Sequence, residues 1–185
     1  MKIYTIIGGV NGAGKSSLTG ALKEERRDLG VIIDVDKIAA NAGISALEAG
    51  KIALQKIEDC LAKEICFTQE TTLSGYRTIK TIKKAREKGY YIRLYYIGLD
   101  TAQESVSRIK NRVQKGGHNI PTQDVIRRFE SRFDCLINTL PYCDEVVFFD
   151  NNNGFTAVGE YANGELSPKG EYRPKWLCEL MEKLK

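Results

Sequence analysis

The sequence has no long apolar run and few residues of the kinds that build disulfide frameworks or metal centres. No stretch approaches the roughly 18 apolar residues that cross a bilayer, and no basic start precedes a cleavable apolar segment. We therefore expect a soluble, cytoplasmic protein that does not associate with membranes. The 5 cysteines are odd in number and lack C-x-x-C or Cys/His spacing, so they imply neither disulfides nor zinc. We expect most of them to be small buried apolar groups.

Internal repeats, low-complexity linkers and concentrated blocks of one charge are also missing. The net charge is +4 over 185 residues, which suits anionic phosphates but is far from the basic tails of nucleic-acid-binding proteins. With 42% hydrophobic residues, the chain is long enough for one α/β domain and too short for two. We expect residues 1–185 to form a single domain.

A glycine-rich segment near the start predicts a phosphate site. Residues 9–16, GVNGAGKS, fit the pattern G-x-x-x-x-G-K-[ST] between an apolar run and a helical pattern, which is the context of a P-loop. The glycines let successive N–H groups face one concavity, and the following helix adds its positive dipole end. We expect ATP there, with Lys15 at the β- and γ-phosphates and the Ser16 hydroxyl on Mg²⁺. The expected nucleotide-binding residues are Gly9, Asn11, Gly12, Ala13, Gly14, Lys15, Ser16 and Ser17.

Short β-rich runs alternate with helical patterns along the chain. This alternation predicts an α/β fold of the P-loop nucleotide-kinase type, with three layers, about five mainly parallel strands and helices on both faces. A small hairpin at Asn163-Gly164 and a short helix after Trp176 form a predicted C-terminal appendage, about 155–185. The expected strands are 3–7, 31–33, 65–68, 91–97 and 145–149, and the expected helices are 16–27, 45–64, 75–88, 101–113 and about 121–140.

Polar residues directly after the predicted strands are site candidates, because ligands of such sheets gather at the carboxyl ends of the strands. Asp36 is our choice for the general base, since phosphoryl transfer needs a carboxylate that orients the acceptor hydroxyl and takes its proton. An equally good local interpretation makes Asp36 a helix N-cap. Asp100 and Asp150-Asn151 satisfy the same rule.

The second and third strand ends supply the expected substrate-binding residues, Asp34, Glu70, Thr71 and Thr72. Glu70 could bind a substrate hydroxyl or a metal-bound water, or it could be another helix cap. The two threonines are short hydroxyl donors of the kind that hold substrates, although such residues are common after strands.

Arginines late in the chain indicate a cationic lid, about 108–121. Arg108 and Arg112 are spaced i, i+4, so a helix puts both guanidinium groups on one face, just before the flexible Gly116-Gly117 pair. Guanidinium groups match phosphate oxygens and stabilise charge on a transferring phosphoryl group. The alternative is a solvated helix face paired with Glu104. His118, beside the glycines, could donate to a phosphate or be a solvent-facing residue.

Two absences separate the classes of P-loop protein. No N-K-x-D triplet follows a later strand, which counts against a guanine-reading GTPase, and neither late strand ends in the Asp-Glu pair of many ATP-hydrolysing motors. Nucleoside and small-molecule kinases remain.

The combination of these segments resembles the zeta-toxin family of P-loop kinases over roughly residues 3–153. The resemblance implies an ATP- and Mg²⁺-dependent toxin of a toxin–antitoxin pair, which phosphorylates UDP-N-acetylglucosamine at the sugar 3′-hydroxyl. It also implies an antitoxin as protein partner. The matching segments are 9–17, 33–39 (IDVDKIA), 70–75 (ETTLSG), Arg108 with Arg112, Gly116-Gly117-His118 and Asp150-Asn151.

Residue by residue, the resemblance gives Asp36 the role of catalytic base, Glu70 that of the substrate-binding acid and Arg108 that of the first phosphate clamp. His118, Arg112 or Arg128 would supply the second lid charge, because His118 stands where better-known members have arginine. The expected acceptor is a small molecule or sugar nucleotide. Two alternatives stay open: an ATP-dependent switch protein without small-molecule turnover, and a polynucleotide kinase, which the regular helical spacing of the basic residues disfavours.

Overall fold

The computed structural model describes residues 1–117 and 119–185. The strands are β1 (Ile3–Gly9), β2 (Val31–Ile33), β3 (Phe67–Thr71), β4 (Tyr91–Ile97), β5 (Glu145–Asp150), β6 (Thr156–Ala162) and β7 (Glu165–Pro168). The helices are α1 (Lys15–Glu25), α2 (Val35–Ala42), α3 (Ala46–Lys63), α4 (Arg77–Glu87), α5 (Ala102–Gln114), α6 (Thr122–Glu130), α7 (Arg132–Ile137) and α8 (Lys175–Lys183), with a 3-10 helix, η1 (Leu140–Tyr142), after α7.

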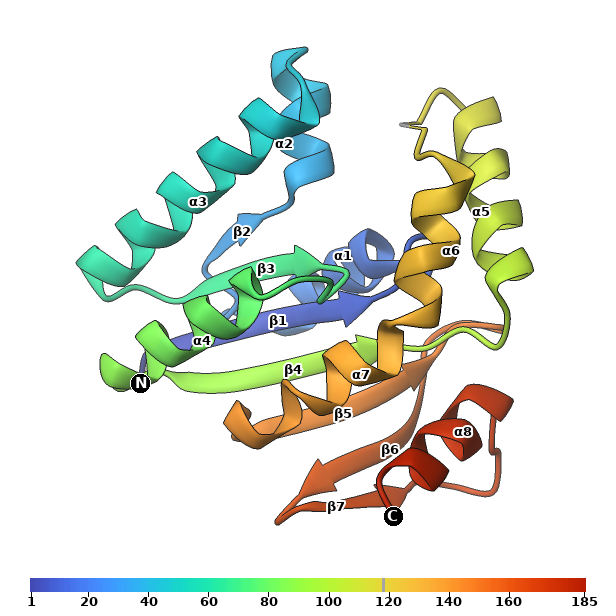
Figure 1. Ribbon diagram of the computed structural model, residues 1–185. Coiled ribbons are helices and arrows are strands. Elements are labelled where there is room, and N and C mark those ends of the chain that lie inside the picture. The colour runs from blue at the N-terminus through green and yellow to red at the C-terminus, as the bar shows by residue number, and fades with distance from the viewer. Residues whose placement is uncertain (118) are drawn as a thin grey trace.

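All the described strands form one sheet in the order β2-β3-β1-β4-β5-β6-β7 (Figure 1). The first five strands of this order are parallel, which confirms the α/β class and the predicted parallel strands. The predicted C-terminal hairpin exists, but β6 pairs antiparallel with β5 and β7 with β6, so the hairpin extends the main sheet. The P-loop strand β1 lies between β3 and β4 and therefore has the ends of both beside it.

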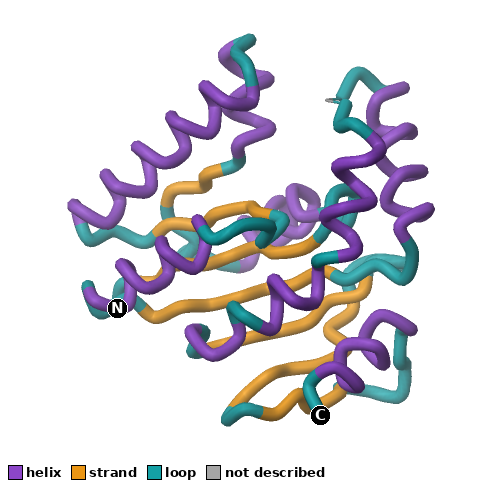
Figure 2. The backbone as a smooth tube through the Cα atoms, viewed as in Figure 1, coloured by secondary structure: helices purple, strands orange, loops and turns teal. Residues whose placement is uncertain are grey.

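Helices lie on both faces of the sheet (Figure 2), and an apolar core of buried side chains covers each face. Alternation along β1 sends Tyr4 and Ile6 into the larger core, which includes residues of α3, α4, α7 and α8. Ile7 belongs to the smaller core with Leu18 and Leu22 of α1. The predicted three-layer arrangement follows from this alternation.

Three sequence expectations about packing were wrong. The helix expected over 121–140 breaks at Ser131 into α6 and α7, and η1 follows. The spacing of Leu47, Leu54, Ile57 and Leu61 predicts one apolar face on α3, but Leu47 and Leu54 are exposed, and the small Ala49 and Ala53 are buried instead. Of the cysteines only Cys60 is buried; all five are free thiols.

The C-terminal helix is attached through the fully buried side chain of Trp176. Asp100, after β4, accepts a hydrogen bond from Trp176 N at 2.9 Å, and Asp150, at the end of β5, accepts from Trp176 Nε1 at 3.0 Å. A Cβ on Gly98 would lie 2.1 Å from the indole, so only glycine fits there. None of the helices in the described part of the chain has the length and apolarity of a membrane span.

Candidate active site

The P-loop connects the end of β1 to the start of α1 through a tight turn that depends on glycines. Gly12 has φ 77° and Gly14 has φ 102°, in the left-handed region that favours glycine. A Cβ on Gly14 would lie 2.4 Å from Asn151 Nδ2, so this position also excludes side chains by contact. Gly14 is the N-cap and has no side chain to cap α1, whose first N–H groups and positive dipole end therefore remain for an anion.

Asn151 supports the loop from the end of β5. Its Nδ2 donates to Ala13 O at 3.0 Å, and Ser105 of α5 donates from Oγ to Asn11 O. Sequence reasoning had Asn151 as a strand-end candidate but did not connect it with the P-loop, since the contact joins residues 138 positions apart. Ser105 carried no sequence signal.

Lys15 bridges the P-loop from within. Its Nζ donates to Gly9 O at 2.9 Å and to Val10 O at 3.0 Å. Desolvation of the ammonium group lowers the pKa of Lys15 to about 8, although the nearby Glu70 carboxylate opposes this shift. Gly9 and Ala13 shape the loop without lining the cavity described below.

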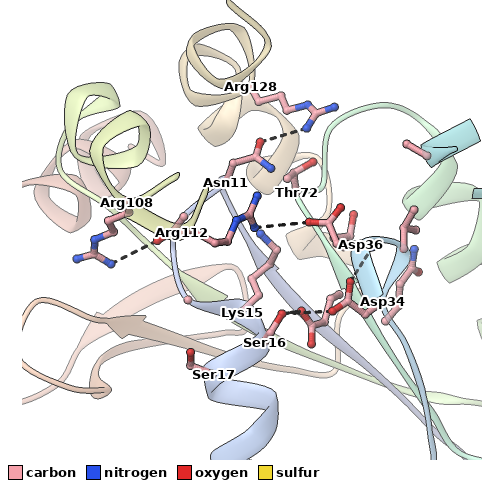
Figure 3. A pocket seen from close by; sticks show the side chains of 17 residues that line it. Asn11, Lys15, Ser16, Ser17, Asp34, Asp36, Thr72, Arg108, Arg112 and Arg128 are labelled. Atoms are coloured by element: carbon pink, nitrogen blue, oxygen red, sulfur yellow. Dashed lines mark hydrogen bonds and ion pairs between the residues drawn. The ribbon is translucent and has the colours of Figure 1, made fainter. Parts of the chain in front are cut away.

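Ser16 meets two carboxylates from neighbouring strands (Figure 3). Its hydroxyl donates to Glu70 Oε2 at 2.6 Å and lies 3.3 Å from Asp34 Oδ2. Both carboxylates are largely buried, and burial raises the pKa of Glu70. Lys37 Nζ lies 3.7 Å from Asp34 and 3.9 Å from Glu70, as a partial counter-charge.

This oxygen-rich cluster fits a Mg²⁺ ion that keeps most of its water. Glu70 Oε1 is buried without a hydrogen-bond partner, and the donor set is hydroxyl and carboxylate oxygen, which Mg²⁺ prefers. The described residues contain no group of three or more His, Cys, Asp or Glu side chains arranged to enclose a metal. Ser16 is therefore the candidate direct ligand, and Asp34 and Glu70 are candidates to orient metal-bound water.

Asp34, rather than Asp36, caps helix α2. Asp34 Oδ1 accepts from Asp36 N at 2.9 Å and from Lys37 N at 3.3 Å. The cap interpretation of Asp36 is therefore wrong, and its side chain is available for another role in the first turn of the helix. Asp36 Oδ2 lies 3.7 Å from Arg112 Nη1, across the cavity from α5, in a pair whose side chains are 50% and 39% exposed.

The two lid arginines diverge although they lie one helical turn apart. Arg112 points toward Asp36, whereas Arg108 points away from it (Figure 3). Arg108 Nη2 pairs with Glu104 and donates to Asn151 O at 2.9 Å, and Nη1 lies 3.5 Å from Gly12 O. Arg108 thus contacts the P-loop at Gly12 and the end of β5 at Asn151, and Arg112 faces the acidic strand ends.

Arg128 of α6 brings a third cation to the site. Its Nη1 donates to Asn11 Oδ1 at 3.1 Å, which ties α6 to the P-loop. His118, the other candidate for a lid charge, lies outside the described residues.

Strand β3 runs further than the sequence indicated, through Thr71. Thr71 Oγ1 accepts from Leu73 N at 3.1 Å and stabilises the turn that follows, and Thr72 shares a hydrogen bond with Ser74 at 2.7 Å. Asp100 and Asp150 are not at this site, because Trp176 engages them.

One cavity of about 510 Å³ brings the other candidates together between the P-loop, the strand ends and α5–α6. Val35, Ala46 and Gln69 also line it, and no sequence signal pointed to them. Its lining consists of Asn11, Gly12, Gly14, Lys15, Ser16, Ser17, Asp34, Val35, Asp36, Ala46, Gln69, Glu70, Thr71, Thr72, Arg108, Arg112 and Arg128.

A parallel α/β sheet with this loop and cavity defines a P-loop protein of the kinase-like type. The family model described as zeta toxin matches residues 1–154. The chain belongs to the zeta-toxin family.

A curated relative from Haemophilus influenzae, described as an uncharacterized protein, is 35% identical over 124 residues, which are 64% of this chain and 86% of that protein. Among solved structures, the chain is similar to an AvrRxo1-ORF1:-ORF2 complex with ATP, with a TM-score of 0.66 and 17% identity. That match covers 100% of this chain, which spans 63% of the length of the matched chain.

A further similar structure is that of the PezAT chromosomal toxin–antitoxin system of Streptococcus pneumoniae, with a TM-score of 0.63 and 18% identity. The match covers 100% of this chain and 85% of the other. Identities at this level establish the shared fold.

Proposed function

We propose that the protein is an ATP-dependent phosphotransferase that transfers the γ-phosphoryl group to a hydroxyl of a small molecule. The main support is that one cavity contains Lys15 of the P-loop and, from α2, the carboxylate of Asp36. This carboxylate does not serve as the helix cap, because Asp34 does. A phosphate cradle alone would fit any P-loop protein. A carboxylate opposite the cradle adds the group that an acceptor hydroxyl requires.

In this mechanism the P-loop N–H groups, Lys15 and α1 bind the triphosphate. Mg²⁺ at Ser16 would neutralise charge on the phosphates. Asp36 orients the acceptor hydroxyl and takes its proton as the oxygen attacks. Arg112 exchanges its contact with Asp36 for the transferring phosphoryl group, and Arg128 adds positive charge beside Asn11. Arg108 acts by holding the P-loop against α5.

Family membership further supports a role as the toxin of a toxin–antitoxin pair, with an antitoxin protein as partner. The similar PezAT structure is that of a chromosomal toxin–antitoxin system. UDP-N-acetylglucosamine is the acceptor that the family resemblance suggests. An enzyme that consumes ATP also needs the nucleotide pool of the cytoplasm, where we place it.

The test is transfer of label from γ-labelled ATP to small molecules of a cell extract. Lys15→Ala is expected to abolish transfer and weaken ATP binding, whereas Asp36→Ala is expected to abolish transfer while ATP binding persists. Unchanged turnover in Asp36→Ala would remove Asp36 from its role. If the wild type bound ATP but labelled no small molecule, the result would favour the switch protein instead. The Arg112–Asp36 contact, which joins α5 to α2 across the cavity, is compatible with that alternative.

A further inference from the structure

One polar side chain interrupts an otherwise apolar row across the sheet. In the strand register, Gln69 of β3 lies between Ile33 of β2 and Ile6 of β1. The row continues from Ile6 through Leu94 of β4 to Val146 of β5. These four aliphatic residues all belong to the larger apolar core. A glutamine in this row forgoes the free energy that a buried aliphatic side chain would gain, so packing does not explain it.

The buried hydroxyl of Tyr4 fixes the orientation of the Gln69 amide. Tyr4 is fully buried, and its OH donates to Gln69 Oε1. Desolvation raises the pKa of Tyr4, so the hydroxyl keeps its proton and requires a hydrogen-bond acceptor. The reversed amide would leave that proton without an acceptor among the described residues. Gln69 therefore directs Nε2, with its two N–H donors, away from Tyr4.

These two donors are open to the candidate active site. Gln69 lines the cavity, and its Nε2 has no hydrogen-bond partner among the described residues but is not buried. Alternation along β3 sends Glu70 to the face where it meets Ser16, and Gln69 to the face covered by Val35 at the start of α2. Gln69 thus lies on the side of the cavity where α2 carries Asp36.

We infer that Gln69 binds the molecule that is phosphorylated, by donating an amide N–H to an uncharged hydroxyl or carbonyl oxygen, and that Tyr4 is the positioning residue for this amide. The inference rests on the proposed kinase function and adds a specificity determinant to it. Because Tyr4 fixes the amide before binding, little side-chain entropy is lost when the hydrogen bond forms. A substrate analogue without the oxygen would leave the donor unpaired and would be rejected.

The test measures label transfer from γ-labelled ATP to UDP-N-acetylglucosamine. If the wild type does not label that compound, a dilution series of the small molecules of a cell extract replaces it, and the half-saturating dilution replaces KM. Gln69→Leu removes both donors and matches the aliphatic row. It should raise the KM for the phosphorylated molecule by about tenfold and leave the KM for ATP within about twofold. Gln55→Leu makes the same change at an exposed position of α3 and should alter neither KM.

A double variant separates this role from a purely structural one, in which Gln69 only satisfies Tyr4. Gln69→Leu leaves the Tyr4 hydroxyl buried without an acceptor and should lower the thermal midpoint. Tyr4→Phe/Gln69→Leu removes that hydroxyl and should restore most of the midpoint, while the raised KM for the phosphorylated molecule persists. Recovery of the wild-type KM together with the midpoint would overturn the inference, as would an unchanged KM in Gln69→Leu.

Two further variants test the direction of the hydrogen bond and the part played by Tyr4. Gln69→Glu replaces the donors by a carboxylate, so the KM should rise at least as far as in Gln69→Leu. A lowered KM in Gln69→Glu would mean that the bound molecule presents a donor, which contradicts the inference. Tyr4→Phe alone frees the amide and should raise the KM by about twofold to threefold. An unchanged KM in Tyr4→Phe would remove Tyr4 from its positioning role.

The outcomes also separate this inference from the function on which it rests. Label transfer by the wild type above the level of Lys15→Ala, with an unchanged KM in Gln69→Leu, would leave the kinase intact and overturn the inference alone. No transfer above Lys15→Ala into UDP-N-acetylglucosamine or any compound of the extract would overturn the proposed function and the inference together.

Discussion

The carboxyl ends of β2 and β3 and those of β4 and β5 obey the same topological rule but differ in use. Asp34 and Glu70, from the first pair of strands, meet Ser16 in the cavity. Asp100 and Asp150, from the second pair, hold Trp176 of the C-terminal segment. A strand-end carboxylate is thus a site candidate only if no later segment covers it. The family match, which stops at residue 154, does not include the segment that covers the second pair.

The largest expected effect comes from the end of β2, which lines the cavity and is not covered by the C-terminal segment. Asp36→Asn keeps the shape of the side chain and removes the carboxylate that we propose as the proton acceptor, so kcat should fall by about 10²–10⁴-fold. The thermal midpoint should change little, because Asp36 is half exposed and the cap is Asp34. Steady-state kinetics and calorimetry measure the two quantities. Asp150→Asn is the matched variant of the other pair and should show the reverse, lost stability with activity retained per folded molecule. Equal losses of kcat in both variants would erase the distinction between the two regions.

Trp176→Ala tests the covered strand ends directly. It removes a fully buried side chain whose indole N–H satisfies Asp150, while the backbone hydrogen bond to Asp100 remains, and should lower the free energy of unfolding by about 3–5 kcal/mol. Urea denaturation measures this change. Trp176→Phe keeps most of the apolar volume and loses the indole N–H, so the cost should be smaller, about 1–3 kcal/mol for the unsatisfied Asp150 oxygen. If the free energy of unfolding of Trp176→Ala were within error of the wild-type value, the packing of Trp176 would not stabilise the C-terminal segment against the sheet.

The sequence was sufficient for features set by local pattern. The P-loop, the five parallel strands and the hairpin turn each follow from residues close together in the chain, and the fold confirms them. The break at Ser131 was missed because Val125, Phe129, Phe133 and Leu136 keep a helical apolar spacing across it. Periodicity shows which side chains face the core. A bend that keeps the same side chains facing the core does not change the pattern, so the sequence does not reveal it.

Long-range contacts account for what the sequence did not indicate about the candidate site. The i, i+4 spacing predicted one shared direction for Arg108 and Arg112, but Glu104 and Asn151 O hold the first, and the second reaches Asp36. Likewise, the sequence left a helix cap open as the alternative role of Asp36. The start of α2 at Val35 makes Asp34 the cap instead.

The next expected effect concerns pH and the P-loop side of the cavity. The pKa of Lys15 is lowered to about 8 by desolvation, and a triphosphate requires the charged ammonium group. Between pH 7 and pH 9 the charged fraction falls by about tenfold, so the affinity for ATP should fall by up to about tenfold as pH rises. Isothermal titration measures the affinity. In Lys15→Arg the cation persists at both pH values, and the slope should flatten. A slope shared by wild type and Lys15→Arg would assign it to another group.

The smallest effect lies at the boundary of the two regions, where β5 ends. Asp150 faces Trp176, but the next residue, Asn151, donates to Ala13 O of the P-loop at 3.0 Å and also presents its own carbonyl to Arg108. Asn151→Ala removes one hydrogen bond of about 1 kcal/mol, so ATP affinity should weaken about fivefold while the thermal midpoint moves little. Asn152→Ala is the control, since its side chain touches Arg108 and leaves the P-loop contact in place. If Asn151→Ala instead lowered the thermal midpoint as far as Asp150→Asn and left ATP affinity unchanged, the whole end of β5 would belong with the covered strand ends, and the boundary would lie between β1 and β4.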